Sequence, residues 1–340
     1  MQNRKIVYMF PENQAPSWFA RSMPQEQAWE YWRPDQNYDT STVFYYDMYG
    51  PFQELIEQQL QRGHRIIYDA KNEHYVHPHK RWILESFQQH PGQGCFVISG
   101  DAAQNIPGVK IIATQYWYWA TDQNNLRFFR LDRYQPQPRH THKFFMSMGL
   151  WRKERDYLFD GLGELLDQSI YSYRHRGINL PNDWTENMGG PWQRYINTDW
   201  LDSTPFTLAV ETYVGESDQS GGYSLTKNDN LFLCEKSYKP LACKHPILMV
   251  STVGNLAYLR QQGFETFPEL WDESYDNILD WRQRIDRIIQ IVREFDVGLL
   301  NNLHVQEKLR YNSARFFDSV LSRRLLKETV VDPVIEFVNE

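Results

Sequence analysis

The sequence has few cysteines, no long apolar segment and no excess of positive charge. Its three cysteines, Cys95, Cys234 and Cys243, show neither the paired spacing of a metal site nor a disulfide framework, which is typical of a reducing compartment. No segment approaches the roughly 18 apolar residues of a membrane-spanning helix, and the N-terminus does not resemble a signal peptide. The net charge of -7 argues against a general nucleic-acid binder. We therefore expect a soluble cytoplasmic protein, in the host cytoplasm if it is viral, with no membrane span.

Two α/β patterns follow one another along the 340 residues. In each, short apolar runs typical of buried strands alternate with segments of helical periodicity, which predicts mostly parallel sheets covered by helices. In the first pattern the expected strands are 5–10, 65–69, 94–101 and 110–114, and the expected helices are 51–62 and 80–89. In the second, the expected strands are 143–148, 206–211 and 246–250, and the expected helices are 153–167, 235–242, 254–262, 278–295 and 305–328.

A polar, Arg-rich segment at 121–142 separates the two patterns and is typical of a linker. We therefore expect an N-terminal α/β domain over 1–135 on the acceptor side and a second α/β domain over 140–304 that binds a nucleotide-sugar. A final helical segment over 305–340 is expected to pack back on the first domain. The predicted fold class is α/β, with two tandem Rossmann-like domains that face a cleft. A ligand is expected in that cleft, at the carboxyl ends of the strands.

The second pattern contains the segment most informative about chemistry. A strand ends at Glu211, a polar loop follows up to Asn230, and a helix then begins at Glu235-Lys236. A helix start offers unpaired N–H groups to an anion, and a lysine in its first turn adds positive charge, as a diphosphate requires. Taken alone, Glu235 and Lys236 are ordinary residues of a helix start. The surrounding pattern makes them candidates for a binding site.

That pattern resembles the donor-binding domain of α-1,3-fucosyltransferases and of related viral and bacterial glycosyltransferases of the GT-B fold. In that family a strand ending in Glu-Asn precedes a helix that begins Thr-Glu-Lys, and a buried strand of the Pro-Ile-Val-Val kind comes next. The parallel parts here are Leu208-Ala-Val-Glu211-Thr212, Cys234-Glu-Lys-Ser-Tyr-Lys-Pro-Leu241 and His245-Pro-Ile-Leu-Met-Val250. The continuation over 258–276 looks like the viral and phage branch. The resemblance covers residues 140–295 and is most specific over 206–276.

The resemblance implies a role for each matching residue. Lys236 would contact the donor diphosphate and Glu235 the ribose or the sugar, while Glu211 stands where the family has its strand-end Glu. The family also has an Arg on the first helix of this domain that pairs with the phosphates. Arg155 is the first candidate for that position and Arg152 the second.

The sequence departs from the family pattern at two of these positions. Thr212 replaces the usual Asn, which puts the details of donor-sugar contact in doubt, and Cys234 replaces the usual Thr, which removes one hydroxyl. Asn230 and Lys239 belong to the same segment and complete the expected donor-binding set.

Two absences bear on the reaction mechanism. No Asp-x-Asp triplet occurs, which argues against the metal-chelating type of glycosyltransferase and is consistent with Lys236 and Arg155 stabilising the leaving group. The alternating histidines at 77 and 79 and at 140 and 142 have no third ligand at a suitable spacing. We therefore expect no metal and no cofactor, with a nucleotide-sugar as the donor substrate.

An inverting transfer also needs a base near the acceptor hydroxyl, which this fold supplies from the first domain. Asp69 and Glu73 follow the apolar run 65–68, and Asp101 follows the run 94–99, so each is expected past the carboxyl end of the apolar part of a strand. We rank Glu73 and Asp69 ahead of Asp101 as candidate catalytic residues.

The predicted function is transfer of a hexose, deoxyhexose or pentose from a nucleotide to a glycan acceptor, with inversion and without a metal. Two alternatives remain open. The acceptor could be a modified base of phage DNA, which the acidic charge balance disfavours because duplex binding requires a basic face. The chain could also be a catalytically inert protein that binds carbohydrate or nucleotide.

Overall fold

The computed structural model describes residues 4–9, 29–31, 33, 36–47, 53–70, 81–98, 106–114, 126–127, 130–180, 196–215 and 231–340. These residues form two compact units: those of the first fall within 1–117 and 320–340, and those of the second within 118–319. Each unit contains one sheet, and every strand pair in both sheets is parallel. The predicted α/β class with two parallel, helix-covered sheets is confirmed. The unit boundaries lie at 117/118 and 319/320, where the sequence predicted 135–140 and 304/305.

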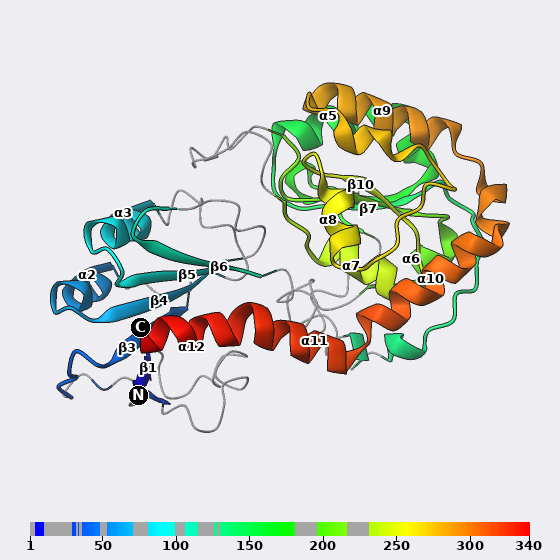
Figure 1. The fold of residues 1–340 in the computed structure, drawn as a ribbon. Coiled ribbons are helices and arrows are strands. Elements are labelled where there is room, and N and C mark those ends of the chain that lie inside the picture. Colours follow the sequence, from blue (N-terminus) through cyan, green and yellow to red (C-terminus); the bar gives the residue numbers. More distant parts are fainter. Residues whose placement is uncertain are drawn as a thin grey trace. The chain divides into compact units, whose positions relative to one another are not determined.

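The first unit is built on a six-stranded sheet in the order β2-β1-β3-β4-β5-β6 (Figure 1). The strands are β1 (Ile6–Tyr8), β2 (Trp29–Tyr31), β3 (Val43–Asp47), β4 (Arg65–Ala70), β5 (Gly94–Ile98) and β6 (Val109–Ala113). Its helices are α2 (Gln53–Gln61), α3 (Arg81–Gln89), α11 (Ser319–Leu326) and α12 (Asp332–Asn339), with a π-helical segment Lys327–Val331 joining the last two.

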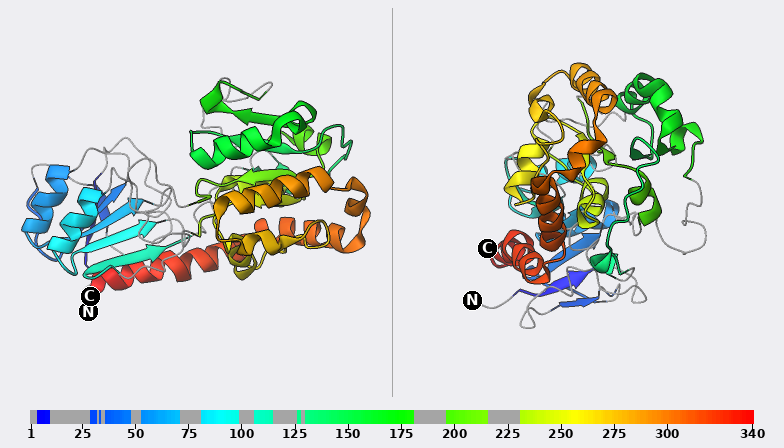
Figure 2. Two further views of the ribbon diagram at one scale, coloured as in Figure 1. Left: turned by 90° about the horizontal axis from the view of Figure 1, so that it is seen from above. Right: turned by 90° about the vertical axis from the view of Figure 1, so that its right-hand side faces the viewer.

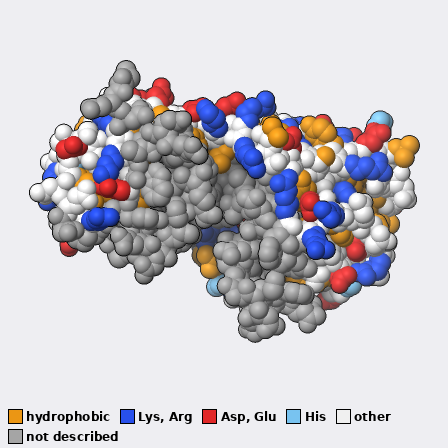
Figure 3. Space-filling view, turned by 90° about the horizontal axis from the view of Figure 1, so that it is seen from below, with side chains coloured by type: hydrophobic (Ala, Val, Ile, Leu, Met, Phe, Trp, Pro, Cys, Tyr) orange, Lys and Arg blue, Asp and Glu red, His pale blue; other side chains and the backbone are white. Residues whose placement is uncertain are grey.

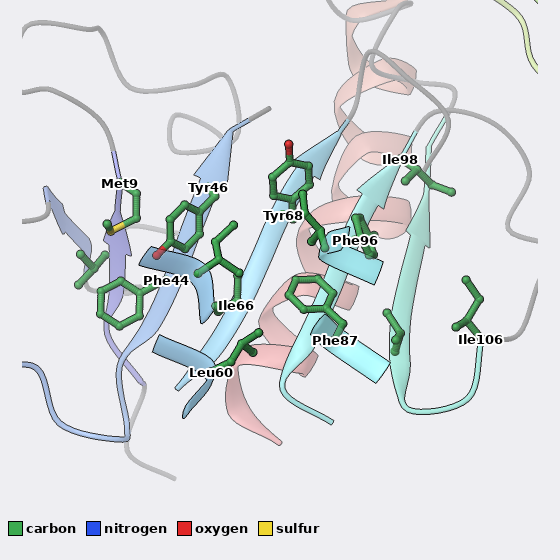
Figure 4. Packing of buried hydrophobic residues seen from close by; sticks show 14 residues of the cluster. Met9, Phe44, Tyr46, Leu60, Ile66, Tyr68, Phe87, Phe96, Ile98 and Ile106 are labelled. Carbon is green, nitrogen blue, oxygen red and sulfur yellow. The ribbon is translucent and has the colours of Figure 1, made fainter. Parts of the chain in front are cut away.

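The core of the first unit lies on both faces of this sheet. On one face, aromatic and aliphatic side chains of β3, β4 and β5 pack against α2 and α3 (Figure 4). Phe87 of α3 lies against Phe96 of β5, with ring centroids 5.0 Å apart. Gly94 permits this approach, because a Cβ atom there would lie 2.1 Å from the Phe87 ring. A side chain at this position would therefore push α3 away from the sheet.

The last part of the chain is divided between the two units. The expected helix 305–328 is interrupted: α10 (Leu303–Phe316) packs on α7 (Glu235–Ala242) in the second unit, where the Ser313 hydroxyl donates to the Ala242 carbonyl at 2.7 Å. Beyond it, apolar residues of α11, the π-helical segment and α12 cover the other face of the first sheet (Figure 1). Only residues from 320 onward thus pack with the first unit.

The second unit is built on a four-stranded sheet in the order β10-β9-β7-β8, with helices on both faces (Figure 2). The strands are β7 (Phe145–Met148), β8 (Ile170–Tyr173), β9 (Thr207–Val210) and β10 (Ile247–Val250). Besides α7 and α10, the helices are α5 (Lys153–Leu162), α6 (Thr198–Ser203), α8 (Asn255–Gln261) and α9 (Trp281–Glu294). Short 3-10 helices are Leu131–Arg133, Gly163–Gln168, Arg174–Arg176, Glu273–Asn277 and Val297–Asn301. Helices α5 and α9 lie side by side.

His245 connects the amino ends of two strands in the second unit and makes its stability depend on pH. Its Nδ1 lies 3.0 Å from the Thr207 hydroxyl and its Nε2 lies 2.9 Å from the Thr204 carbonyl oxygen. Burial lowers the pKa of His245 to about 4. The unfolded chain takes up this proton near pH 6.5, so the stabilisation is complete above pH 6.5 and is lost as the pH falls toward 4.

From this group alone we expect the free energy of unfolding to fall by about 3 kcal/mol between pH 7 and pH 4. Urea denaturation of the protein and of a His245→Gln variant at several pH values measures this effect. The variant should show a shallower pH dependence, and His304→Gln, at a largely exposed histidine, should not. Equal pH slopes for wild type and His245→Gln would contradict this assignment.

Candidate functional site

The topology of the second sheet marks one place where a ligand is expected. The chain runs from β7 through α5 to β8 on one side and then returns to place β9 on the other side of β7, so the strand order reverses between β7 and β9. Ligands of open parallel sheets bind at the carboxyl ends of the strands at such a switch point. The strands β7 and β9 pair only at Phe145↔Thr207 and Met146↔Leu208, whereas β7–β8 and β9–β10 pair over four residues each. They therefore separate toward their carboxyl ends.

Arg155 spans this separation. It lies in the first turn of α5, and its guanidinium donates to the Leu150 carbonyl after β7 at 2.7 Å and to the Glu211 carbonyl after β9 at 3.2 Å. The residue is 4% exposed, and its Nε has no hydrogen-bond partner among the described residues. Burial and the neighbouring Arg152 lower the pKa of Arg155, but a guanidinium remains charged in proteins.

Glu211 connects the end of β9 to the start of α7. Its side chain is completely buried. Oε1 accepts hydrogen bonds from the Cys234 backbone N–H at 3.0 Å and the Ser237 hydroxyl at 2.6 Å, and Oε2 accepts one from the Cys234 thiol at 2.7 Å. Burial raises the pKa of Glu211, although nearby Lys236 and these donors oppose the shift.

The first turn of α7 holds an ion pair between adjacent residues. The Lys236 ammonium lies 3.1 Å from Glu235 Oε1 and 3.2 Å from the Cys234 sulfur, and 12% of its side chain is exposed. Burial opposes ionisation of Glu235, yet Lys236 and Lys239 together lower the pKa of Glu235 to about 2. Burial likewise opposes the charge of Lys236, but Cys234, Glu235 and Glu211 raise the pKa of Lys236 above its usual value. Both residues are therefore charged at neutral pH.

The helices at the switch point differ from their neighbours in how they begin. Helices α6, α9 and α10 begin with an N-cap side chain that accepts a backbone N–H: Asn197, Asp280 and Asn302, respectively. At the start of α8 the Asp276 carboxylate accepts the Leu256 N–H. The N-cap residues of α5 and α7, Arg152 and Cys234, accept no such hydrogen bond. These two starts carry the cationic Arg152, Lys153 and Lys236 together with the acidic Glu154, Asp156 and Glu235. Cations are unfavourable near the positive end of the helix dipole, and a bound anion would offset them and accept N–H groups there.

The structure brings together five residues of the predicted donor-binding set: Arg152, Arg155, Glu211, Glu235 and Lys236. Thr212 follows Glu211 directly and is partly exposed. Lys239, one turn after Glu235, is 4% exposed and forms no hydrogen bond to a described residue, and its charge acts on Glu235. Asn230 lies outside the described residues.

The candidate catalytic residues of the first unit are less informative. Glu73 and Asp101 lie outside the described residues. Asp69 does not follow its strand as expected. Strand β4 extends to Ala70, and the Asp69 carboxylate is fully buried, where it accepts a hydrogen bond from the Tyr45 hydroxyl. This burial does not favour Asp69 as a base that contacts a substrate, and its catalytic role stays a prediction.

One residue that organises the site was missed in the sequence. Arg284 on α9 is 1% exposed and donates from Nε to the Ser251 carbonyl at 3.0 Å and from its two terminal nitrogens to the Ile278 and Val214 carbonyls. It thereby joins the segments after β9 and β10 to the start of α9. The available signal was its position between Trp281 and Ile288, on the apolar face of the predicted helix.

The positive charge at the switch point is a local feature. On the face drawn in Figure 3, Lys and Arg side chains of the second unit lie among acidic side chains, as expected for a protein with a net charge of -7. Among the described residues no group of His, Cys, Asp or Glu side chains is arranged to hold a metal ion. Within the same part of the chain, no helix has the length and apolar character needed to cross a membrane.

Comparison of the chain with models of protein families, with curated proteins and with solved structures gives no match. A function is therefore inferred from the geometry of the site and from the sequence pattern that it contains.

Proposed function

We propose that the second unit binds the diphosphate of a nucleotide-sugar at the carboxyl ends of β7 and β9, and that the protein is a glycosyltransferase of the GT-B type. The observation that carries this proposal is the pair of helix starts, α5 and α7, whose N-cap side chains accept no N–H group, at the switch point where these strands separate. Each start offers N–H groups and a cationic side chain to an anion. A diphosphate has two phosphate groups, one for each helix start.

The charges around this place also suit a diphosphate. Of the predicted donor-binding residues, four are cationic, Arg152, Arg155, Lys236 and Lys239, and two are carboxylates, Glu211 and Glu235. When the bond from the anomeric carbon to the donor phosphate breaks, negative charge grows on the leaving diphosphate. Fixed cations that already lie at that place stabilise the charge without reorganisation. The proposed transfer is inverting and independent of a metal, with a glycan as acceptor.

Burial divides the two arginines between two roles. Arg155 is 4% exposed, and two of its nitrogens donate to backbone carbonyls. It therefore holds the segments after β7 and β9 and does not face a ligand. Arg152 is partly exposed at the N-cap of α5, where it makes a local hydrogen bond to the Trp151 carbonyl at 2.9 Å. We therefore assign the direct phosphate contact to Arg152 and Lys236, and the positioning of the two strand ends to Arg155.

The proposal is tested by thermal-shift measurements with GDP-, UDP-, dTDP- and CDP-linked sugars, in the presence of excess EDTA. A ligand present at about 100 times its Kd stabilises the folded state by about 2.7 kcal/mol, so a true donor should raise the Tm. If none of these nucleotides changes the Tm, the donor site does not exist.

A second assay separates catalysis from binding. The stabilising donor is incubated with glycan acceptors and with DNA that carries modified bases, and the release of nucleoside diphosphate is measured. Transfer to a glycan is the expected result. Transfer to DNA alone would establish the alternative acceptor, and binding without any transfer would identify a catalytically inert binding protein.

A further inference from the structure

Glu211 is enclosed too completely to be a ligand contact. A carboxylate offers about four positions for hydrogen bonds, and three of those of Glu211 are filled by donors of α7 and its N-cap. The side chain has no exposed surface. Burying a carboxylate costs free energy of folding unless its oxygens accept hydrogen bonds. The three donors around Glu211 compensate this cost.

We propose that Glu211, Cys234 and Ser237 form a buried positioning network that holds the Lys236 ammonium at the start of α7. In this network the Cys234 thiol is an essential donor to the Glu211 carboxylate. The consequence for nucleotide binding rests on the proposed function, whereas the effect on Lys236 itself does not.

The path of the hydrogen bonds explains how Glu211 acts at a distance. Cys234 donates its thiol proton to Glu211 Oε2 at 2.7 Å, and the same sulfur lies 3.2 Å from the Lys236 ammonium, to which it presents a lone pair. Cys234 thus relays the position of the carboxylate to the ammonium. At the other end, the backbone carbonyl of Glu211 accepts a hydrogen bond from Arg155, so one residue fixes both helix starts.

Ser237 and Cys234 both donate hydrogen bonds to the Glu211 carboxylate. The Ser237 hydroxyl donates to Oε1 at 2.6 Å, and the Cys234 backbone N–H donates to that oxygen at 3.0 Å. These hydrogen bonds oppose rotation of the first turn of α7 about its axis relative to β9. Lys236 lies between Cys234 and Ser237 in the sequence, and both of these residues donate to Glu211. A rotation of this turn would therefore carry Lys236 away from the switch point.

The test uses the amine reactivity of Lys236, which needs no ligand. The rate of acylation of Lys236 is measured by quantitative mass spectrometry in wild type, Cys234→Ala, Cys234→Ser, Ser237→Ala and Glu211→Gln. Loss of one hydrogen bond corresponds to about a fivefold change in an equilibrium. We expect the rate to rise by about that factor in Cys234→Ala and Ser237→Ala, and to return to the wild-type value in Cys234→Ser.

Glu211→Gln and Ser313→Ala keep the test decisive. Gln keeps one acceptor oxygen, enough for the Cys234 N–H and the Ser237 hydroxyl, but places an NH2 group where the second oxygen accepts the Cys234 thiol, and it removes the negative charge. The variant should fold, and the acylation rate should rise. Ser313→Ala removes a hydroxyl that donates to the opposite end of α7, to the Ala242 carbonyl at 2.7 Å. It should leave the Lys236 rate unchanged. Equal rates in Cys234→Ala and wild type, or an equal rise in Ser313→Ala, would overturn the proposal.

The dissociation constant of the stabilising nucleotide, measured in parallel, gives the second readout. It should increase in Cys234→Ala and recover in Cys234→Ser. If no nucleotide binds the wild-type protein, the proposed function fails, but the acylation rates still decide whether the network positions Lys236.

Discussion

Lys236→Gln is expected to weaken binding of the nucleoside diphosphate by about 10- to 150-fold, because a hydrogen bond to a charged group contributes about 1.5–3 kcal/mol. The substitution removes the ammonium from the helix start nearest the end of β9, and it leaves Glu235 as a nearby negative charge without its partner at 3.1 Å. The remaining carboxylate then repels the phosphates that the ammonium attracted. Isothermal titration calorimetry at fixed ionic strength measures the change in Kd.

Lys308→Gln is the matched control for this experiment. Lys308 also lies in the second unit and also forms an ion pair, with Glu269 at 2.7 Å, but it belongs to α10. Its replacement removes the same charge without removing a cation from the starts of α5 or α7. Its Kd should equal that of wild type. A Kd for Lys236→Gln within about twofold of the control would refute the phosphate contact, since one charged hydrogen bond changes Kd by more than that.

Elements with a strong local pattern were predictable from the sequence. The strands β9 and β10 and the helix that starts at Glu235 lie close to the predicted 206–211, 246–250 and 235–242. Each is a short apolar run or an amphipathic segment that ends at a residue able to stop it. The strand order β8-β7-β9-β10 in the second unit then makes β7 and β9 neighbours, as expected for this fold class.

Other elements depend on contacts between distant residues. Strand β3, at 43–47, was not predicted, although Val43, Phe44, Tyr45 and Tyr46 are typical strand residues. The stretch 33–42 that precedes it is polar and contains no apolar run. The predicted helix 305–328 is interrupted after Phe316, where α10 caps the end of α7 and the chain passes to the other unit. No local signal in the sequence marks that point.

The orientation of side chains at the site was less predictable than their position. The sequence predicted Glu211 and Arg155 as donor-binding residues. In the structure both lie at the carboxyl ends of β7 and β9, and both are buried in the protein. Glu211 binds the N-cap and first turn of α7, and Arg155 binds the backbone carbonyls that follow β7 and β9. Spacing along a sequence shows which residues meet at a sheet edge, whereas burial after packing decides which of them face a ligand.

Arg284→Met is expected to lower the free energy of unfolding of the second unit by about 3–5 kcal/mol, because the change leaves buried polar groups without partners. The guanidinium donates to four backbone carbonyls, those of Val214, Ser251, Ile278 and Leu279, and Met can donate to none of them. The matched control is Arg287→Met, one turn further along α9, where the arginine side chain is 31% exposed and its ion pair with Asp272 spans 3.2 Å. A surface pair of that kind contributes at most about 1 kcal/mol.

Urea denaturation of both variants measures the difference, and equal losses would show that Arg284 does not hold the strand ends together. Because Val214 and Ser251 follow β9 and β10, the Arg284 variant should also bind nucleotide less tightly than the Arg287 variant under conditions where both are folded.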